Sequence, residues 1–123
     1  MTDPVFEITK AATFDAAHYI SVGHDEDRYR RVHGHSFRVE ATVRGTAEPA
    51  AGWVLDLGAL DRALGEAARA LDHGLLNEQP GLETPTLERL CLYFAGRLKP
   101  DFPGLARIMV GRPSVGESCV LTL

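Results

Sequence analysis

The chain has 123 residues, of which 45% are hydrophobic and 24% are charged, a balance typical of one folded globular domain and not of a disordered chain. With 17 acidic and 13 basic residues the net charge is −4, which excludes a general basic surface for nucleic acid or anionic lipid. No apolar run approaches the ~20 residues of a membrane helix, and the first residues lack a secretion-signal pattern. We therefore expect a single cytoplasmic domain over residues 1–123 with no nucleic-acid or membrane partner.

The first half of the chain predicts two antiparallel β-strands. Residues 36–44 alternate strictly, with Phe37 on the apolar side and Arg38 on the polar side, as in a half-buried strand. Residues 5–14 alternate less well but are rich in strand-forming side chains. Residues 45–52 contain proline and several small residues and predict a loop.

Two helices are predicted next. The first begins after Asp56 as N-cap and ends near Asp72, and the second has Thr84 as cap, Pro85 at its first position and Pro100 beyond its end. The first apolar stripe comprises Leu57, Leu60, Leu64, Ala68 and Leu71. The second comprises Leu87, Leu90, Cys91, Phe94 and Leu98.

The end of the chain predicts two more short strands, at residues 105–110 and 119–123. The resulting order, ββααββ, predicts an α+β fold with a four-stranded antiparallel sheet and both helices on one face. The two cysteines, Cys91 and Cys119, form no CxxC pair, and we expect them to be buried free thiols.

Three of the five histidines suggest a metal site. His33 and His35 stand two residues apart, so in an extended chain both rings project from one face, and Gly34 places no side chain between them. His18, at the end of the neighbouring strand, can add a third nitrogen. Three neutral imidazoles with one open position describe a catalytic zinc site. The alternative is a set of ordinary polar histidines around a loop, the role that we expect for His24.

A second candidate is the adjacent pair Asp72 and His73 at the end of the first helix. A carboxylate beside an imidazole can fix its tautomer and raise its basicity, as a general base requires. Adjacent helical side chains do not face each other, so the alternative is a polar helix end with a histidine cation favoured by the helix dipole.

Five blocks in the same order resemble the 6-pyruvoyltetrahydropterin synthase and 6-carboxytetrahydropterin synthase family. The blocks are residues 14–18, 33–37, 52–57, 71–77 and 80–86. The resemblance is strongest to the bacterial 6-carboxytetrahydropterin synthases, and it implies the tunnelling fold, in which subunits join their sheets into a barrel as a homotrimer or a homohexamer. Assembly would also cover the free sheet edges.

The same resemblance implies roles for individual residues. His18, His33 and His35 match the zinc ligands, and Asp72 and His73 match a pair that serves the catalytic cysteine and proton transfers. The family acts on 7,8-dihydroneopterin triphosphate, which implies a zinc-dependent lyase or synthase that makes 6-carboxytetrahydropterin for the deazapurine (queuosine) pathway or 6-pyruvoyltetrahydropterin.

One departure from the family pattern concerns the proton-transfer base. Tyr29 stands where the bacterial enzymes have cysteine, and a tyrosine phenolate, with an ordinary pKa of ~10, needs help from zinc or from a nearby arginine, namely Arg28, Arg30 or Arg31. An acid at residues 25–27 is an alternative base, for retro-aldol cleavage of the substrate side chain.

The other departure concerns the ring anchor. Arg112 stands where relatives hold the pterin donors with glutamate, and arginine has no acceptor. Either Glu117 takes over, or the ligand presents a carboxylate, phosphate or carbonyl to Arg112. A different class of function, a catalytically inactive zinc-bearing binding module or a member with a non-pterin substrate, is also compatible with these two replacements.

Overall fold

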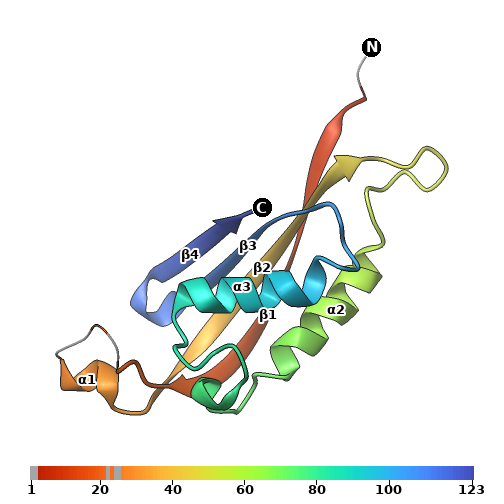
Figure 1. Ribbon diagram of the computed structural model, residues 1–123. Helices are drawn as coiled ribbons and strands as arrows, with labels where there is room; N and C mark the ends of the chain where they lie inside the picture. Colours follow the sequence, from red (N-terminus) through yellow and green to blue (C-terminus); the bar gives the residue numbers. More distant parts are fainter. Residues whose placement is uncertain (1–2, 22, 24–25) are drawn as a thin grey trace.

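A computed structural model describes residues 3–21, 23 and 26–123, in which four strands form one antiparallel sheet in the order β1-β2-β3-β4. The strands are β1 (Val5–His18), β2 (His33–Thr46), β3 (Leu105–Arg112) and β4 (Glu117–Thr122). The helices are α1 (Asp27–Arg30), α2 (Leu57–Arg69) and α3 (Leu87–Leu98), with the 3-10 turns η1 (Leu76–Glu78) and η2 (Pro113–Val115). α2 packs on β1 and α3 on β3 and β4, on the same face of the sheet (Figure 1). The predicted α+β arrangement is therefore confirmed.

The long pair of β1 and β2 carries the candidate metal ligands. It runs in continuous register from Val5 opposite Thr46 to His18 opposite His33. The predicted alternation in β2 is confirmed, because Phe37 is only 1% exposed and its ring stacks on Phe14 with centroids 5.0 Å apart. Both strands are longer than predicted at the histidine end, since the polar motif residues there also pair.

The helix starts agree with the sequence in one case only. The Asp56 carboxylate accepts a hydrogen bond from the Gly58 amide at 2.8 Å, as expected for the α2 cap. The predicted start of α3 at Pro85 with Thr84 as cap is wrong, because the Thr86 hydroxyl accepts from the Arg89 amide at 3.2 Å and the helix begins at Leu87, two residues later than predicted. Pro85 lies before the cap, and its carbonyl oxygen lies 3.2 Å from Nδ1 of His18.

One residue of the first apolar stripe does not join the core. Leu57 is 46% exposed, whereas Leu60 and Leu64 are fully buried. Side chains on a helix lean toward its N-terminus, so the first residue of α2 leans over the preceding loop, where it lines an apolar hollow with Phe6 and Trp53. The expectation for Leu57 was therefore wrong.

Two further expectations concern the cysteines and the membrane. Cys91 and Cys119 are both free, the first buried and the second only half-buried. Among the described residues, none of the helices has the length and apolar character that a membrane crossing requires.

Candidate metal centre and active site

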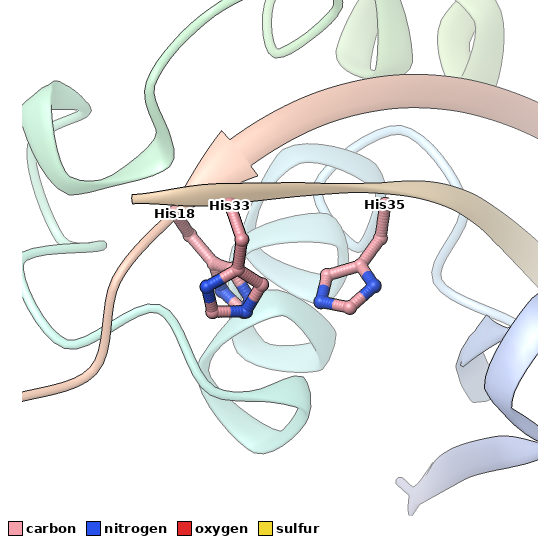
Figure 2. Close-up of side chains that lie close together, drawn as sticks. All are labelled: His18, His33 and His35. Carbon is pink, nitrogen blue, oxygen red and sulfur yellow. The ribbon is translucent and has the colours of Figure 1, made fainter. Parts of the chain in front are cut away.

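Three imidazoles converge at the end of the β1–β2 pair (Figure 2). His18 and His33 are direct cross-strand partners, and His35 lies two residues further along β2 on the same face. Their ring centroids are 4.6 to 5.1 Å apart, and one ring nitrogen from each lies within 4.8 Å of the others. The sequence prediction that strand periodicity would gather these rings is confirmed, and together they could hold a metal ion.

The hydrogen bonds of two rings fix which nitrogen is free. His18 Nδ1 lies 3.2 Å from the Pro85 carbonyl oxygen and His33 Nδ1 lies 2.7 Å from the Arg31 carbonyl oxygen. Because a carbonyl only accepts, each Nδ1 carries the proton and donates, so that in a neutral ring the Nε2 lone pair is the free one. Hydrogen bonds of this kind, from the ring nitrogen that does not bind the metal, orient metal-binding histidines in general.

The environment of these rings also suits a cation. His18 is completely buried, and its Nε2 has no hydrogen-bond partner in the described part of the chain. Burial lowers the pKa of His18 to about 4, with the nearby histidines and Arg112 acting in the same direction, and burial followed by the charge of Arg112 lowers the pKa of His35. Neutral rings with a buried, unsatisfied nitrogen fit a metal-binding role, because only the neutral form can ligate.

A side-chain amide fixes the chain directly after His18. Asn77, in η1, accepts from the Tyr19 amide at 3.0 Å and donates to the Tyr19 carbonyl at 2.9 Å. Both backbone groups of Tyr19 are thereby satisfied at the point where β1 ends, so the position of the His18 backbone is determined from both sides.

The imidazoles open into a cleft of about 660 Å³. The other residues that line it are Ile20, Arg28, Tyr29, Arg112, Val115 and Glu117. The structure therefore places Tyr29, on α1, beside the candidate metal ligands. The guanidinium of Arg28 donates to the Tyr29 hydroxyl at 2.8 Å and lies 4.8 Å from the centre of its ring, so one of the expected arginine neighbours is present.

Arg112 and Glu117 occupy the same cleft as a pair. They are cross-strand partners in β3 and β4, with 3.0 Å between Arg112 Nε and Glu117 Oε1. The Arg112 side chain is 14% exposed and that of Glu117 is 52% exposed. The buried Nε of Arg112 is close enough to the carboxylate for an ion pair, but the geometry of the contact is not that of a hydrogen bond. The cleft thus offers both a cation and a carboxylate at the predicted ring-anchor position.

The two described acidic residues near Tyr29 do not line this cleft. Glu26 pairs with Arg28 at 2.8 Å, and neither Glu26 nor Asp27 lines the cleft. His24 and Asp25 lie outside the described residues.

The pair Asp72 and His73 lies in a turn beyond the end of α2. His73 has a left-handed backbone with φ of 59°, and in this conformation its Nδ1 donates to Asp72 Oδ2 at 2.9 Å. The expectation that helical geometry keeps these two side chains apart is wrong, because α2 ends at Arg69 and both residues lie beyond it. The hydrogen bond that His73 donates to Asp72 raises the pKa of His73, whereas hydrogen bonds from the Asp15 amide, first, and from His73 lower the pKa of Asp72.

His73 lines a different cleft, of about 560 Å³. Asp15, Ser36 and Ser114 also line it. Asp15 and Ser36 are cross-strand partners with exposed side chains, which alternate with core residues of β1 and β2. His35 borders both clefts. Within one described chain, His73 and Tyr29 therefore belong to different sites.

Comparison with known proteins identifies the family. A family model described as 6-pyruvoyl tetrahydropterin synthase matches residues 7–121. The chain belongs to the 6-pyruvoyl tetrahydropterin synthase family. It is 36% identical over 109 residues to the 6-carboxy-5,6,7,8-tetrahydropterin synthase of Synechocystis, and the aligned region covers 84% of this chain and 83% of the relative. It is 32% identical over 93 residues to the dihydroneopterin monophosphate aldolase of Pyrococcus furiosus, and the aligned region covers 76% of this chain and 75% of that relative.

The fold of the family is shared as well. The 6-pyruvoyl tetrahydropterin synthase of Caenorhabditis elegans superposes with a TM-score of 0.83 at 19% identity, covering 100% of this chain and 99% of that one. The tunnelling fold expected from the sequence is confirmed.

Sequence reasoning missed several groups that build this 6-pyruvoyl tetrahydropterin synthase-like site. The Pro85 and Arg31 carbonyls orient two ligands, but a backbone acceptor leaves no mark in a side-chain pattern. Asn77 stands at the end of one of the family blocks and could have been found from it. Asp15 lies in the first family block and could have been identified from it as well.

Proposed function

We propose that this protein is a zinc-dependent lyase or synthase that acts on 7,8-dihydroneopterin triphosphate or a close relative of it. The observation that carries the proposal is the convergence of three imidazoles, one with a buried Nε2 that has no hydrogen-bond partner in the described part of the chain, beside an open cleft. Membership of the family and similarity to the Synechocystis 6-carboxy-5,6,7,8-tetrahydropterin synthase support a pterin substrate.

His18, His33 and His35 would hold the metal, and three imidazole nitrogens suit Zn²⁺ well. When bound there, zinc would polarise a substrate oxygen and ease the loss of a neighbouring proton. The Pro85 and Arg31 carbonyls accept from Nδ1 of His18 and His33, which leaves Nε2 of both rings as the nitrogen that would hold the metal.

Tyr29 and the ion pair supply binding and proton transfer in the cleft. The Tyr29 hydroxyl accepts a hydrogen bond from Arg28. With its own proton given up to solvent, the phenolate would accept a proton from substrate beside the Arg28 guanidinium. Glu117 accepts hydrogen bonds from ring N–H donors, while Arg112 donates to a carbonyl or anionic group of the same ligand.

His73 completes the site only if copies of the chain associate. Its imidazole lines the second cleft, apart from Tyr29. β1 and β4 form the two edges of the described sheet, and at the histidine end the β1 edge is already bonded to residues 73–75. A homotrimer or homohexamer that pairs these edges would protect them and present His73 of one copy to the metal cleft of the next. Self-association is thus part of the proposed function.

A second reaction of the same class is retro-aldol cleavage of the dihydroneopterin side chain. The Pyrococcus relative named as a dihydroneopterin monophosphate aldolase favours it. In that reaction a base removes a side-chain hydroxyl proton, the adjacent carbon–carbon bond breaks to give an aldehyde, and the ring-side carbon takes up a proton. The two reactions need the same groups and differ in the bond that breaks.

The test combines substrate turnover with metal analysis. Zinc-loaded protein is incubated separately with 7,8-dihydroneopterin triphosphate and with dihydroneopterin monophosphate, and products are followed by mass spectrometry. His35→Ala should lose both metal and turnover. His73→Ala should keep the metal and lose turnover by about 10²–10⁴-fold, as expected for a proton-transfer residue, while Glu66→Ala on the exposed side of α2 should match the wild type. Absence of both turnover and pterin binding would contradict the proposal and favour a non-enzymatic zinc-bearing module.

The contribution of a neighbouring copy is tested by mixing. His35→Ala and His73→Ala chains are co-expressed with different tags, and the mixed assembly is isolated. Shared sites predict partial return of turnover, because one intact metal cleft can meet one intact His73. No return in a confirmed mixed assembly would mean that both residues act within the same chain.

A further inference from the structure

The outer edge of β1 holds the Asp72–His73 pair through one residue, Asp15. The Asp15 amide donates to Asp72 Oδ1 at 2.9 Å, and the Asp15 carbonyl accepts from the His73 amide at 2.7 Å. A short parallel bridge between Ala17 and Leu75 continues the contact. These bonds support the left-handed conformation of His73, which costs free energy in a residue other than glycine.

The side chain of Asp15 adds a second carboxylate to the same place. Ser36, its cross-strand partner, donates to Asp15 Oδ1 at 2.6 Å and so fixes the orientation of the carboxylate. Asp15, Ser36 and His73 line one cleft, and none of the described residues that line it is lysine or arginine. An imidazole in this cleft therefore faces two carboxylates and no permanent cation of the same chain.

We propose that Asp15 is a positioning residue that, together with Asp72, holds His73 in its protonated form as a proton donor toward the second cleft. The inference rests on the proposed function, in which His73 takes part in proton transfer. Nδ1 of the imidazolium keeps its hydrogen bond to the Asp72 carboxylate, and Nε2 donates its proton to a substrate atom. The neutral ring then recovers a proton from water, so the residue is unchanged after each turnover.

The electrostatics agree with the geometry. The hydrogen bond and the charge of Asp72 raise the pKa of His73, the charge of Asp15 acts in the same direction, and burial opposes them weakly enough that the net direction is upward. The facing groups are Asp72 from the same turn, Asp15 from β1, and His35 from β2, which borders the cleft.

The test measures the titration of His73 directly. Protein labelled with ¹³C-histidine is titrated by NMR in its assembled, zinc-loaded form, and the His73 signal is assigned by its loss in His73→Gln. Asp15→Asn removes the charge with little change of shape and should shift the titration midpoint of His73 downward, by less than Asp72→Asn does. Asp15→Glu should restore the midpoint. Glu40→Gln, which removes a carboxylate from β2 paired with Arg38, should leave it unchanged.

The NMR readout separates this inference from the proposed reaction. An unchanged midpoint in Asp15→Asn would overturn the positioning role, whatever the turnover. A downward shift supports the role, and the high-pH limb of the kcat/KM profile should then move down by the same amount. If the midpoint moves but the pH profile does not, His73 is not the proton donor and the inference fails on its catalytic part.

Discussion

The burial of His18 makes a quantitative prediction about acid stability in the metal-free protein. Burial lowers the pKa of His18 to about 4 from its ordinary value of 6.5. In this pH range the His18 ring binds a proton in the unfolded chain but not in the folded chain. Folding therefore becomes less favourable as pH falls from 6.5 to 4. Between about pH 7 and about pH 5 this single group should cost about 2 kcal/mol of unfolding free energy.

The assay compares wild type with His18→Gln, which cannot titrate and keeps a donor for the Pro85 carbonyl. Urea unfolding in the presence of a chelator at the two pH values gives four free energies of unfolding. The wild type should lose about 2 kcal/mol more than the variant on acidification. The comparison cancels the contribution of His73, whose raised pKa has the opposite sign because folding gains stability when that ring is protonated.

The association state should be measured by light scattering at both pH values, so that dissociation is not mistaken for titration. Equal losses in wild type and His18→Gln would refute the reasoning, because they would show that His18 is either solvated or already protonated in the folded chain. An excess loss in the variant would refute it as well.

Three further substitutions test the elements that hold the site. Thr86→Ala removes the cap bond to the Arg89 amide and should cost about 1 kcal/mol of unfolding free energy, while Thr86→Ser should cost much less; equal effects would mean that the hydroxyl is not the cap. Phe94→Ala removes a fully buried ring and should cost about 3–5 kcal/mol in chemical unfolding, and a loss below about 1 kcal/mol would contradict the packing of α3 on the sheet. Asn77→Ala leaves both backbone groups of Tyr19 without their partner and should cost about 2 kcal/mol, with weaker metal binding by calorimetry; unchanged metal affinity would show that this clamp does not hold His18.

The metal half of the site could be predicted from local periodicity. In an extended chain, His33 and His35 must share a face, and the strict alternation that continues into Phe37 identifies that face as the core side. His18 required one additional assumption, that β1 pairs antiparallel with β2, and the observed register then places it opposite His33.

The remaining groups depend on geometry that side-chain patterns do not contain. Nothing in the sequence around His73 indicates a left-handed residue held at a strand edge. Arg112 and Glu117 are five positions apart and become partners only because η2 makes the turn between β3 and β4. The start of α3 was misplaced because two threonines flank Pro85 and the sequence alone does not choose between them.

The separation of the two clefts follows from the strand on which both depend. β1 places His18 on the helix-covered face, where burial keeps the ring neutral, and three residues earlier Asp15 uses its backbone edge and outward side chain to hold His73. A neutral ligand and a protonated donor need opposite environments, dry and apolar for one and anionic and exposed for the other. A sheet whose two faces differ in this way meets both requirements within four residues. It does so only by placing the two groups in different clefts of one chain, and for that reason the proposed chemistry needs a second copy to bring them together.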